Sequence, residues 1–378
     1  MSETYPEPVA GPGSEMVFPP PAPMGFSSPA AATPLNGDVA LRLAAMACAL
    51  CIIVMLAGLL IVLFRASVPS IRAYGFSFLV HSEWRPNQLE RPLRGPDGKI
   101  VFKNDEMVME TVPEAFGALP VIYGTAVSSV LSLIFAIPLS MGAALFLVRV
   151  APNWLKPPVS FLIEFLAAIP SIAYGIWGLF ILAPFLQNHV EPFLQRILEP
   201  LPYTQWLFQS PVSVGASTIM RPISLTGRDM FSGSLVLAIM IIPIITAISR
   251  DVLRQVPRAQ VEGSVALGAT WWQSCAEMLK YSRSGLFGAV MLGLARAAGE
   301  TMAVTMVIGN NNQIVLSPFA PAQTMSSLLA NEFAEASTEI HRAALCEVAL
   351  ILLVMSLIFN VVARWLVVGK GSRTAAAH

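Results

Sequence analysis

Long apolar runs, separated by shorter polar segments, set the pattern of this chain. A helix that crosses a bilayer needs roughly 20 predominantly apolar residues. Each of these runs is too apolar and too long for the amphipathic helix of a soluble domain. The runs cover residues 39–64, 119–148, 159–186, 232–249, 285–309 and 343–368. The pattern therefore predicts an all-α polytopic membrane protein with about six transmembrane helices.

Prolines fall inside three of these runs. Pro138 lies in the second run, Pro170 and Pro184 lie in the third, and Pro243 lies in the fourth. A transmembrane helix tolerates proline because neighbouring helices and Ser or Thr hydroxyls satisfy the freed carbonyl groups. We therefore expect one continuous helix for each run.

The segments between the runs predict the domain organisation. Residues 1–38 are rich in Pro, Gly, Ser and Ala and contain no Lys or Arg, which is typical of a disordered tail. They lack the basic start of a signal peptide, so the first run is expected to remain as a span. The expected parts are the tail 1–38, the first transmembrane helix 39–64, an outer loop 65–118, a core 119–368 with five further spans and a polar loop at 250–284, and a C-terminal tail 369–378.

Composition agrees with a membrane protein and excludes other classes. Hydrophobic residues make up 55% of the 378 positions and charged residues 12%, and the mean hydropathy is +0.66. A disordered chain would be poor in apolar residues, and a soluble globule could not cover so much apolar surface. The 23 Lys and Arg balance 23 Asp and Glu, so the basic surplus typical of a nucleic-acid partner is absent.

The positions of the cations predict the orientation. The positive-inside rule gives most weight to short loops and to residues near the ends of spans. The short turn with Arg149 and Lys156 and the tail with Arg364, Lys370 and Arg373 are basic. Since an even number of spans places both ends on one side, we expect both termini to be cytoplasmic.

Two opposite charges lie near the middle of the fifth run. Arg296 and Glu300 are four residues apart, so they share one face of a helix. A charged side chain at the centre of a membrane helix costs roughly 2.5–3.5 kcal/mol on insertion scales. One interpretation is an ion pair that fixes helix packing, and the other is a polar translocation path. Glu164 and Glu347, near the starts of the third and sixth runs, are weaker candidates for the same path.

The residues around the pair favour the path. Small residues recur every four positions and predict a packing face for another helix. They are Gly285, Ala289, Gly293, Ala297 and Thr301. Gly299, one turn from Arg296, leaves room for a substrate beside the guanidinium. We therefore expect Arg296, Glu300, Gly299 and Thr301 to form a substrate-binding and translocation site.

The chemistry of the pair suits an oxyanion. The planar fork of an arginine donates two hydrogen bonds to two oxygens and stays charged at physiological pH. A carboxylate beside it repels an anion but can accept a hydrogen bond from the P–OH of hydrogen phosphate. Sulfate at neutral pH has no proton to offer. Arg296 and Glu300 therefore favour phosphate over sulfate.

Catalytic and metal-binding patterns are missing from the sequence. No segment matches G-x-x-x-x-G-K-[ST], so the chain has no phosphate-binding P-loop of its own. The four histidines are scattered and form no nucleophile–base set. Cys48 and Cys51 form a C-x-x-C inside the first run without a nearby histidine or second pair, so we interpret them as small apolar residues. We expect no enzyme activity, no cofactor and no metal site.

The polar loop at 250–284 carries a second signal. Arg250, Arg254 and Arg258 recur every four residues, and Trp271 and Trp272 follow Gly268. Gly268 is a candidate helix C-cap or turn, so the loop predicts a helix–turn–helix at the membrane surface. It is either an interfacial loop with aromatic anchors or a helix that docks onto a partner.

The segment Glu262-Gly263-Ser264-x-x-x-Gly268 resembles the EAA loop of ABC importer permeases, which has alanines at the second and third positions. More specifically, the chain resembles the PstC family of phosphate permeases. Four segments carry this resemblance: FGALPVIYGT at 116–125, AAIPSIAYGIWGLF at 167–180, LAIMIIPII at 237–245, and RAAGETMAV at 296–304.

The resemblance implies a type I ABC importer permease fold in a bacterial inner membrane, with residues 65–118 as a periplasmic loop. It implies import of inorganic phosphate by alternating access, with Arg296 and Glu300 in translocation. Glu262, Gly263, Ser264 and Gly268 would couple the loop to ATPase subunits, which would use ATP. The implied partners are a homologous permease subunit, two ATPase subunits and a periplasmic phosphate-binding protein.

Three alternatives remain at this stage. An ion-coupled secondary anion transporter would work without ATP and would contain an inverted repeat. A membrane scaffold would use Arg296 and Glu300 only to lock helices together. A permease for another oxyanion, such as sulfate or molybdate, would share the architecture but differ in substrate.

Overall fold

The structure is a computed structural model that describes residues 36–86, 89–92, 102–103, 106–107, 109–201, 204–214 and 217–375. The chain divides into two units, residues 1–58 and 59–378. The expected disordered tail 1–38 lies almost entirely outside the described residues, and the last three residues of the C-terminal tail lie outside them too.

The described chain is mostly helical, which confirms the predicted fold class. The longer helices are α1 (Asn36–Tyr74), α3 (Leu119–Leu145), α4 (Lys156–Ala168), α8 (Met230–Arg254), α11 (Arg283–Ala298) and α14 (Glu339–Ala375). The shorter ones are α2 (Ser77–Val80), α5 (Ser171–Trp177), α6 (Ala183–Phe185), α7 (Glu191–Leu198), α9 (Arg258–Ala266), α10 (Trp271–Tyr281), α12 (Met302–Val307) and α13 (Met325–Glu332).

The first unit is represented by the N-terminal half of α1. Its apolar side chains are exposed, as shown by Ile52 at 68% and Met55 at 70%. The helix does not stop at residue 64 as the hydropathy pattern suggested, but continues through Pro69 to Tyr74. Ser67 and Ser70, on this continuation in the second unit, are fully buried.

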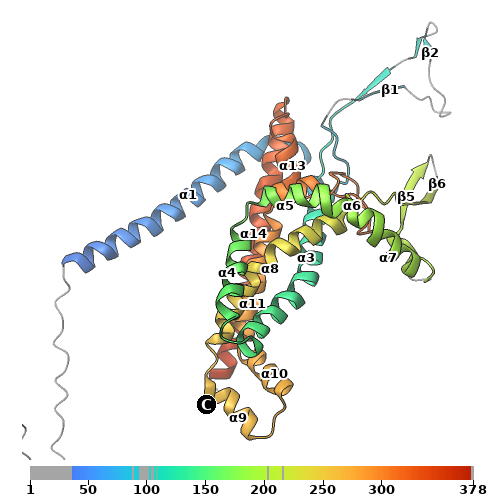
Figure 1. Cartoon of the computed structure of the whole chain (residues 1–378). Coiled ribbons are helices and arrows are strands. Elements are labelled where there is room, and N and C mark those ends of the chain that lie inside the picture. Colours follow the sequence, from blue (N-terminus) through green and yellow to red (C-terminus); the bar gives the residue numbers. More distant parts are fainter. Residues whose placement is uncertain are drawn as a thin grey trace, which may run out of the picture. The chain divides into compact units, whose positions relative to one another are not determined.

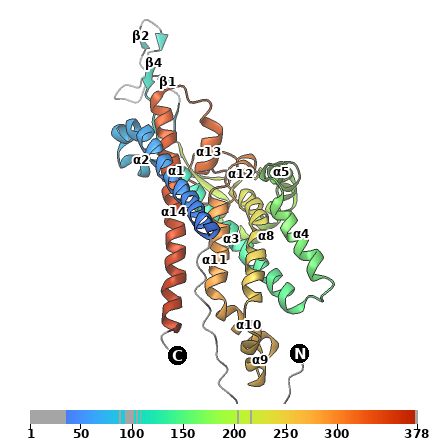
Figure 2. The ribbon, with the colours of Figure 1, turned by 90° about the vertical axis from the view of Figure 1, so that its left-hand side faces the viewer.

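The second unit contains a bundle of helices. α8 packs against α3, α11 and α4, and α11 also packs against α14 and α3. Figures 1 and 2 show these helices running side by side, with α9 and α10 beyond one end and α5, α12 and α13 at the other. The two ends of the bundle are therefore built differently, and the site described below lies toward the end with α12 and α13.

The expected third span is divided, which corrects the prediction of one helix over 159–186. α4 ends at Ala168, and Pro170, with ψ at 137°, is the N-cap residue immediately before α5. Proline has no N–H to donate, and its ring disfavours helical geometry in the residue before it. From Ser171, helical turns η2 (Gly178–Leu182), α6, η3 (Leu186–Val190) and α7 continue to Leu198.

Other prolines do not interrupt their helices. Pro138 lies inside α3 and Pro243 inside α8, as predicted. Pro184 lies within the helical run 171–198, at the start of α6. The outcome at Pro170 is thus set by its surroundings and not by proline alone.

The expected fifth span is also divided. α11 ends at Ala298, and α12 begins at Met302 after the non-helical residues Gly299, Glu300 and Thr301. The prediction of one continuous helix over 285–309 was wrong here. Among the described residues, five helical segments are long and apolar enough to cross a membrane: 39–74, 119–150, 171–198, 230–254 and 339–361. Residues 119–150 comprise α3 and the π-helical η1 (Phe146–Val150).

Small antiparallel sheets form in the loops that were expected outside the membrane. β1 (Leu89–Pro92) pairs with β4 (Met109–Val112), β2 (Phe102–Lys103) pairs with β3 (Glu106–Met107), and β5 (Gln209–Val214) pairs with β6 (Ser217–Pro222). A short 3₁₀ turn, η4 (Gln205–Leu207), precedes β5.

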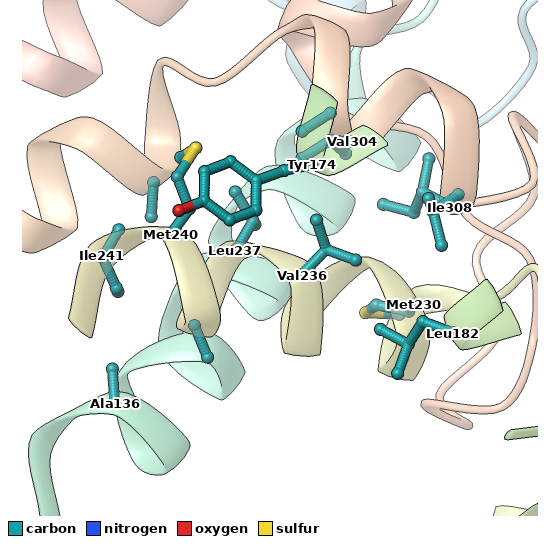
Figure 3. Packing of buried hydrophobic residues seen from close by; sticks show 14 of the residues in the cluster. Ala136, Tyr174, Leu182, Met230, Val236, Leu237, Met240, Ile241, Val304 and Ile308 are labelled. Atoms are coloured by element: carbon teal, nitrogen blue, oxygen red, sulfur yellow. The ribbon is translucent and has the colours of Figure 1, made fainter. Parts of the chain in front are cut away.

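The main apolar core surrounds α8. Leu237, Ile241 and Ile245 are fully buried, and they pack with Val304 and Ile308 from the region of α12. Figure 3 shows Tyr174 of α5 lying over Leu237 and Met240. The helical segments on both sides of each break, at Pro170 and at residues 299–301, therefore pack against α8, which is continuous.

Candidate functional site

Arg296 and Glu300 form an ion pair at the break between α11 and α12. Arg296 lies in the last turn of α11, and its Nη2 is 3.6 Å from Oε2 of Glu300. The Arg296 side chain is 48% exposed, whereas that of Glu300 is 4% exposed. The separation of 3.6 Å is longer than a normal hydrogen bond. The guanidinium therefore contacts the carboxylate loosely and keeps donors for another partner.

The helix ends between these two residues. The Gly299 N–H donates to the carbonyl oxygen of Ala295 at 3.3 Å, which closes the last turn of α11. Gly299 is exposed, and a Cβ placed on it would meet only the Ala295 carbonyl oxygen, at 3.5 Å. The space around Gly299 is therefore open on this side.

The Glu300 carboxylate faces the start of α12. The Ala303 N–H donates to Oε1 of Glu300 at 3.5 Å. Thr301 is half-buried, its hydroxyl lies 3.5 Å from the Gly299 carbonyl oxygen, and its own carbonyl accepts from the Thr305 hydroxyl at 2.6 Å. The break is therefore held by local polar contacts, and its two charged side chains differ strongly in exposure.

Residues far along the chain anchor this break, and the sequence analysis missed them. The Ser326 hydroxyl donates to the Glu300 carbonyl oxygen at 2.7 Å, and the Met325 N–H donates to the Thr125 hydroxyl on α3 at 2.9 Å. A Cβ on Gly124 would lie 2.1 Å from the Gln323 carbonyl oxygen, so only glycine allows this approach. One feature of the sequence could have indicated a polar contact face on α3, namely its row of small hydroxyl residues: Thr125, Ser128, Ser129 and Ser132.

The stripe of small residues on α11 is a packing face, which confirms that prediction. A Cβ on Gly293 would lie 2.6 Å from Cδ1 of Ile245, and one on Gly285 would lie 2.6 Å from Cγ1 of Val252. Both partners are on α8, and Ala289 between them is fully buried. The small residues therefore allow close contact between α11 and α8.

The weaker acidic candidates lie elsewhere. Glu164 on α4 accepts a hydrogen bond from Nη2 of Arg250 at 3.1 Å, and Asp251 accepts from Nε of the same guanidinium at 3.0 Å. The structure therefore gives Glu164 a role in joining α4 to α8. Glu347 on α14 is 7% exposed and forms no ion pair among the described residues.

The polar loop forms two helices joined by a turn, as predicted. α9 and α10 are connected at Gly268, whose φ of +84° favours glycine. Thr270 caps α10, and its hydroxyl accepts from the Gln273 N–H. α9 contains Glu262, Gly263 and Ser264, of which the first two are exposed.

An apolar surface accompanies these residues. Leu267 is 92% exposed, Trp272 is 74% exposed and Val265 is 55% exposed. Exposed apolar groups on a short helical hairpin are typical of a contact surface. This surface is suited either to a membrane interface or to a partner protein.

Comparison of the sequence with known proteins identifies a family and several relatives. Residues 115–369 match the family described as binding-protein-dependent transport system inner membrane component. The chain is 38% identical over 331 residues to the phosphate transport system permease protein PstC of Mesorhizobium japonicum, covering 87% of this chain and 90% of that protein. It is 40% identical over 321 residues to the protein of the same name from Haemophilus influenzae, covering 84% and 89%.

A solved structure described as inward-facing conformations of the MetNI methionine ABC transporter also matches. Its TM-score is 0.47 at 15% identity, and the alignment covers 66% of this chain and 94% of that chain.

Proposed function

The chain belongs to the PstC family of binding-protein-dependent transport system inner membrane components, and we propose that it is the permease subunit of an ATP-driven importer of inorganic phosphate. The permease provides the membrane path and performs no covalent chemistry. The observation that carries the substrate assignment is the pairing of a half-exposed Arg296 with a buried Glu300.

In this proposal Arg296 binds the anion. Its fork can donate two hydrogen bonds to two phosphate oxygens, and its 48% exposure leaves it accessible. Glu300 accepts the hydrogen bond from the protonated phosphate oxygen, which distinguishes hydrogen phosphate from sulfate. The open space at Gly299 and the hydroxyl of Thr301 line the same break in the helix.

The break also supports alternating access. A continuous helix would keep the same hydrogen-bond pattern along the whole span, whereas here residues 299–301 are non-helical and the Glu300 N–H donates to the Ala297 carbonyl oxygen, three residues back. Backbone of this kind is tolerated at membrane depth where protein buries it or where it lines a water-filled cavity. The α11–α12 junction is thus a place where a small rotation can change access to Arg296 at modest cost.

We assign the coupling to ATPase subunits to Glu262, Gly263, Ser264 and Gly268. α10 ends at Tyr281 and α11 begins at Arg283, so Ser282 alone separates them. A displacement of α9 and α10 by a partner would therefore pass directly into α11, which carries Arg296. The exposed Leu267 beside Gly268 gives such a partner an apolar contact.

The complete transporter in this proposal has further subunits. A homologous permease subunit forms the other half of the path, two ATPase subunits bind and hydrolyse ATP, and a periplasmic binding protein delivers phosphate. The chain lies in the bacterial inner membrane with both termini cytoplasmic. Residues 1–38 and 369–378 are then cytoplasmic tails, and residues 65–118 belong to the periplasmic side.

The test is phosphate uptake by the complete complex in proteoliposomes, with ATP inside and phosphate-loaded binding protein outside. Arg296→Lys keeps the charge but loses the fork, so one charge-assisted hydrogen bond worth about 1.5–3 kcal/mol is lost. Uptake should fall roughly ten- to hundredfold. Arg283→Lys, at the exposed start of the same helix, is the matched control.

Two results would contradict the proposal. Wild-type uptake by Arg296→Lys would mean that Arg296 and Glu300 only hold helices together. Uptake by the purified chain without ATP would mean that it is a secondary transporter.

A further inference from the structure

A cavity of about 500 Å³ lies at the far end of α12 from Glu300. Its lining residues come from three separate segments of the second unit. They are Leu179, Ala183, Pro184, Gln187, Thr226, Arg228, Gly309 and Pro321. The cavity therefore lies where the helical run 171–198 meets the loop before α8 and the segment after α12.

Polar donors are present in this lining. Arg228 is exposed and takes part in no ion pair identified among the described residues. Thr226 and Gln187 are the other polar side chains that line the cavity. A cavity with one cation and uncharged donors attracts anions.

The loop that carries Arg228 is held tightly in place. The Arg228 N–H donates to the Thr226 hydroxyl at 3.4 Å, and Nε2 of Gln187 donates to the Leu225 carbonyl oxygen at 3.4 Å. Gly227 has φ of +66°, and a Cβ on it would lie 2.2 Å from the Ala183 carbonyl oxygen. The position of Arg228 is therefore determined by close packing of its loop.

Two acidic side chains lie behind this loop, but they do not face the cavity. Asp229 and Glu191 are both fully buried, and Oδ1 of Asp229 caps α8 by accepting from the Ser232 N–H at 2.8 Å. Neither residue lines the cavity. Both Glu191 oxygens and Oδ2 of Asp229 are inaccessible to solvent. Arg228 is therefore the lining residue that has a charged side chain.

The cavity is close to the proposed translocation site. α12 spans six residues, which is about 9 Å along a helix axis, and it connects the Glu300 break to Gly309 in the cavity lining. A Cβ on Gly309 would lie 2.7 Å from the Arg228 carbonyl oxygen. The Arg228 segment is thus in direct contact with the end of the segment that begins at Glu300.

We propose that this cavity is a second anion-binding site, which holds an oxyanion at Arg228 before it reaches Arg296. The inference rests on the proposed function, since it gives the imported phosphate an additional position. The cavity lining contains no carboxylate, so this site does not distinguish hydrogen phosphate from sulfate. It concentrates oxyanions, and the discrimination takes place at Glu300.

The test compares Arg228→Gln, Arg228→Lys and Arg196→Gln in the complete reconstituted complex with phosphate-loaded binding protein. Arg196 on α7 is exposed and does not line the cavity, so Arg196→Gln is the matched control for loss of one positive charge. Initial phosphate uptake is measured at low and at high ionic strength, and ATP hydrolysis stimulated by the binding protein reports assembly.

Arg228→Gln should reduce uptake by about three- to tenfold at low ionic strength, because a local positive charge raises the anion concentration. The deficit should shrink with added salt, which screens such attraction. Arg228→Lys should retain most of the uptake, and Arg196→Gln should match wild type. In a complex that carries Glu300→Gln, adding Arg228→Gln should reduce sulfate uptake by the same factor by which Arg228→Gln alone reduces phosphate uptake.

Different results would overturn the inference and the proposed function. If wild type and Arg228→Gln take up phosphate equally at every ionic strength, the second site is refuted and the proposed function stands. Equal losses in Arg228→Gln and Arg228→Lys, together with lost ATPase stimulation, would show a structural role and also refute the site. If the wild-type complex takes up no phosphate, the proposed function fails, and the inference fails with it.

Discussion

Nη2 of Arg296 lies 3.6 Å from Oε2 of Glu300, across a break that separates α11 from α12. The two side chains differ in exposure by about tenfold, at 48% and 4%. In a continuous helix this i, i+4 pair would be an ordinary stabilising contact. At a helix break it combines an accessible cation with a buried acceptor, and this asymmetry suits the binding of a protonated anion.

Glu300→Gln should reduce the preference for phosphate over sulfate. The amide keeps the size of the side chain but replaces one acceptor oxygen with a donor. Loss of the hydrogen bond to the phosphate proton should lower phosphate uptake roughly tenfold. Competition of unlabelled sulfate against radiolabelled phosphate measures the preference. Glu335→Gln, which changes an exposed carboxylate, should leave it unaltered, and unchanged discrimination in Glu300→Gln would refute the role of Glu300.

Gly268→Ala should weaken ATP-driven uptake without unfolding the bundle. Gly268 has φ of +84°, and a side chain in that region costs about 1–2 kcal/mol. Uptake per ATP hydrolysed should fall by up to about tenfold. Gly288→Ala on α11 is the control, because a Cβ there has nothing within 4 Å, its φ lies outside the positive region, and Gly288 is not among the residues assigned to coupling. Equal phosphate uptake per ATP hydrolysed in both variants would show that the turn geometry at Gly268 does not affect coupling.

Gly293→Ala should lower thermal stability in detergent. The new Cβ would lie 2.6 Å from Cδ1 and 2.8 Å from Cγ1 of Ile245, and overpacking of this kind costs about 1–3 kcal/mol. Gly288→Ala on the same helix has open space around it and should be neutral or stabilising. Ile245→Val should partly rescue Gly293→Ala. Additive losses in the double variant would contradict direct contact between the two residues.

Asp229→Asn should change how stability depends on pH. Burial raises the pKa of the Asp229 carboxyl above its ordinary value, against the opposing effect of hydrogen bonds from Ser232. The folded state therefore holds a proton that the unfolded state releases above about pH 4. The contribution of Asp229 to stability falls as the pH rises from this value through the folded pKa.

Thermal unfolding of wild type and Asp229→Asn from about pH 4 upward to pH 8 checks this prediction. The variant should lose less stability than wild type over this range, because asparagine caps a helix without ionising. Asp229→Ala also removes the charge but loses the cap, so it should be about 1 kcal/mol less stable than Asp229→Asn. Parallel pH profiles for wild type and Asp229→Asn would contradict the titration of Asp229 in this range.

Much of the local structure could be predicted from the sequence. Apolar runs identified the helical segments, since a segment that crosses a bilayer must be apolar and must satisfy its own backbone hydrogen bonds. Gly268 identified the turn between α9 and α10. Spacing of four residues brought Arg296 and Glu300 together and predicted the face on which Gly285 and Gly293 pack. Each of these features depends on neighbours within a few residues along the chain.

The breaks at Pro170 and at residues 299–301 were missed for a physical reason. Pro138 and Pro243 lie in continuous helices, so the outcome at a proline depends on which groups surround it. At Glu300 a long-range contact holds the break, since the Ser326 hydroxyl donates to the Glu300 carbonyl oxygen from 26 residues away. A hydropathy pattern contains no information about such a partner.

The sequence by itself determined that this chain is a helical membrane protein with one opposite pair of charges in an apolar run and a polar helical loop. Only the tertiary structure decided that Glu300 is buried while Arg296 stays accessible, and that Arg228, Gln187 and Gly309 line one cavity. Composition and periodicity set local conformation and the need for burial. Exposure and long-range contact depend on which segments pack together, and that is settled only when the whole chain has folded.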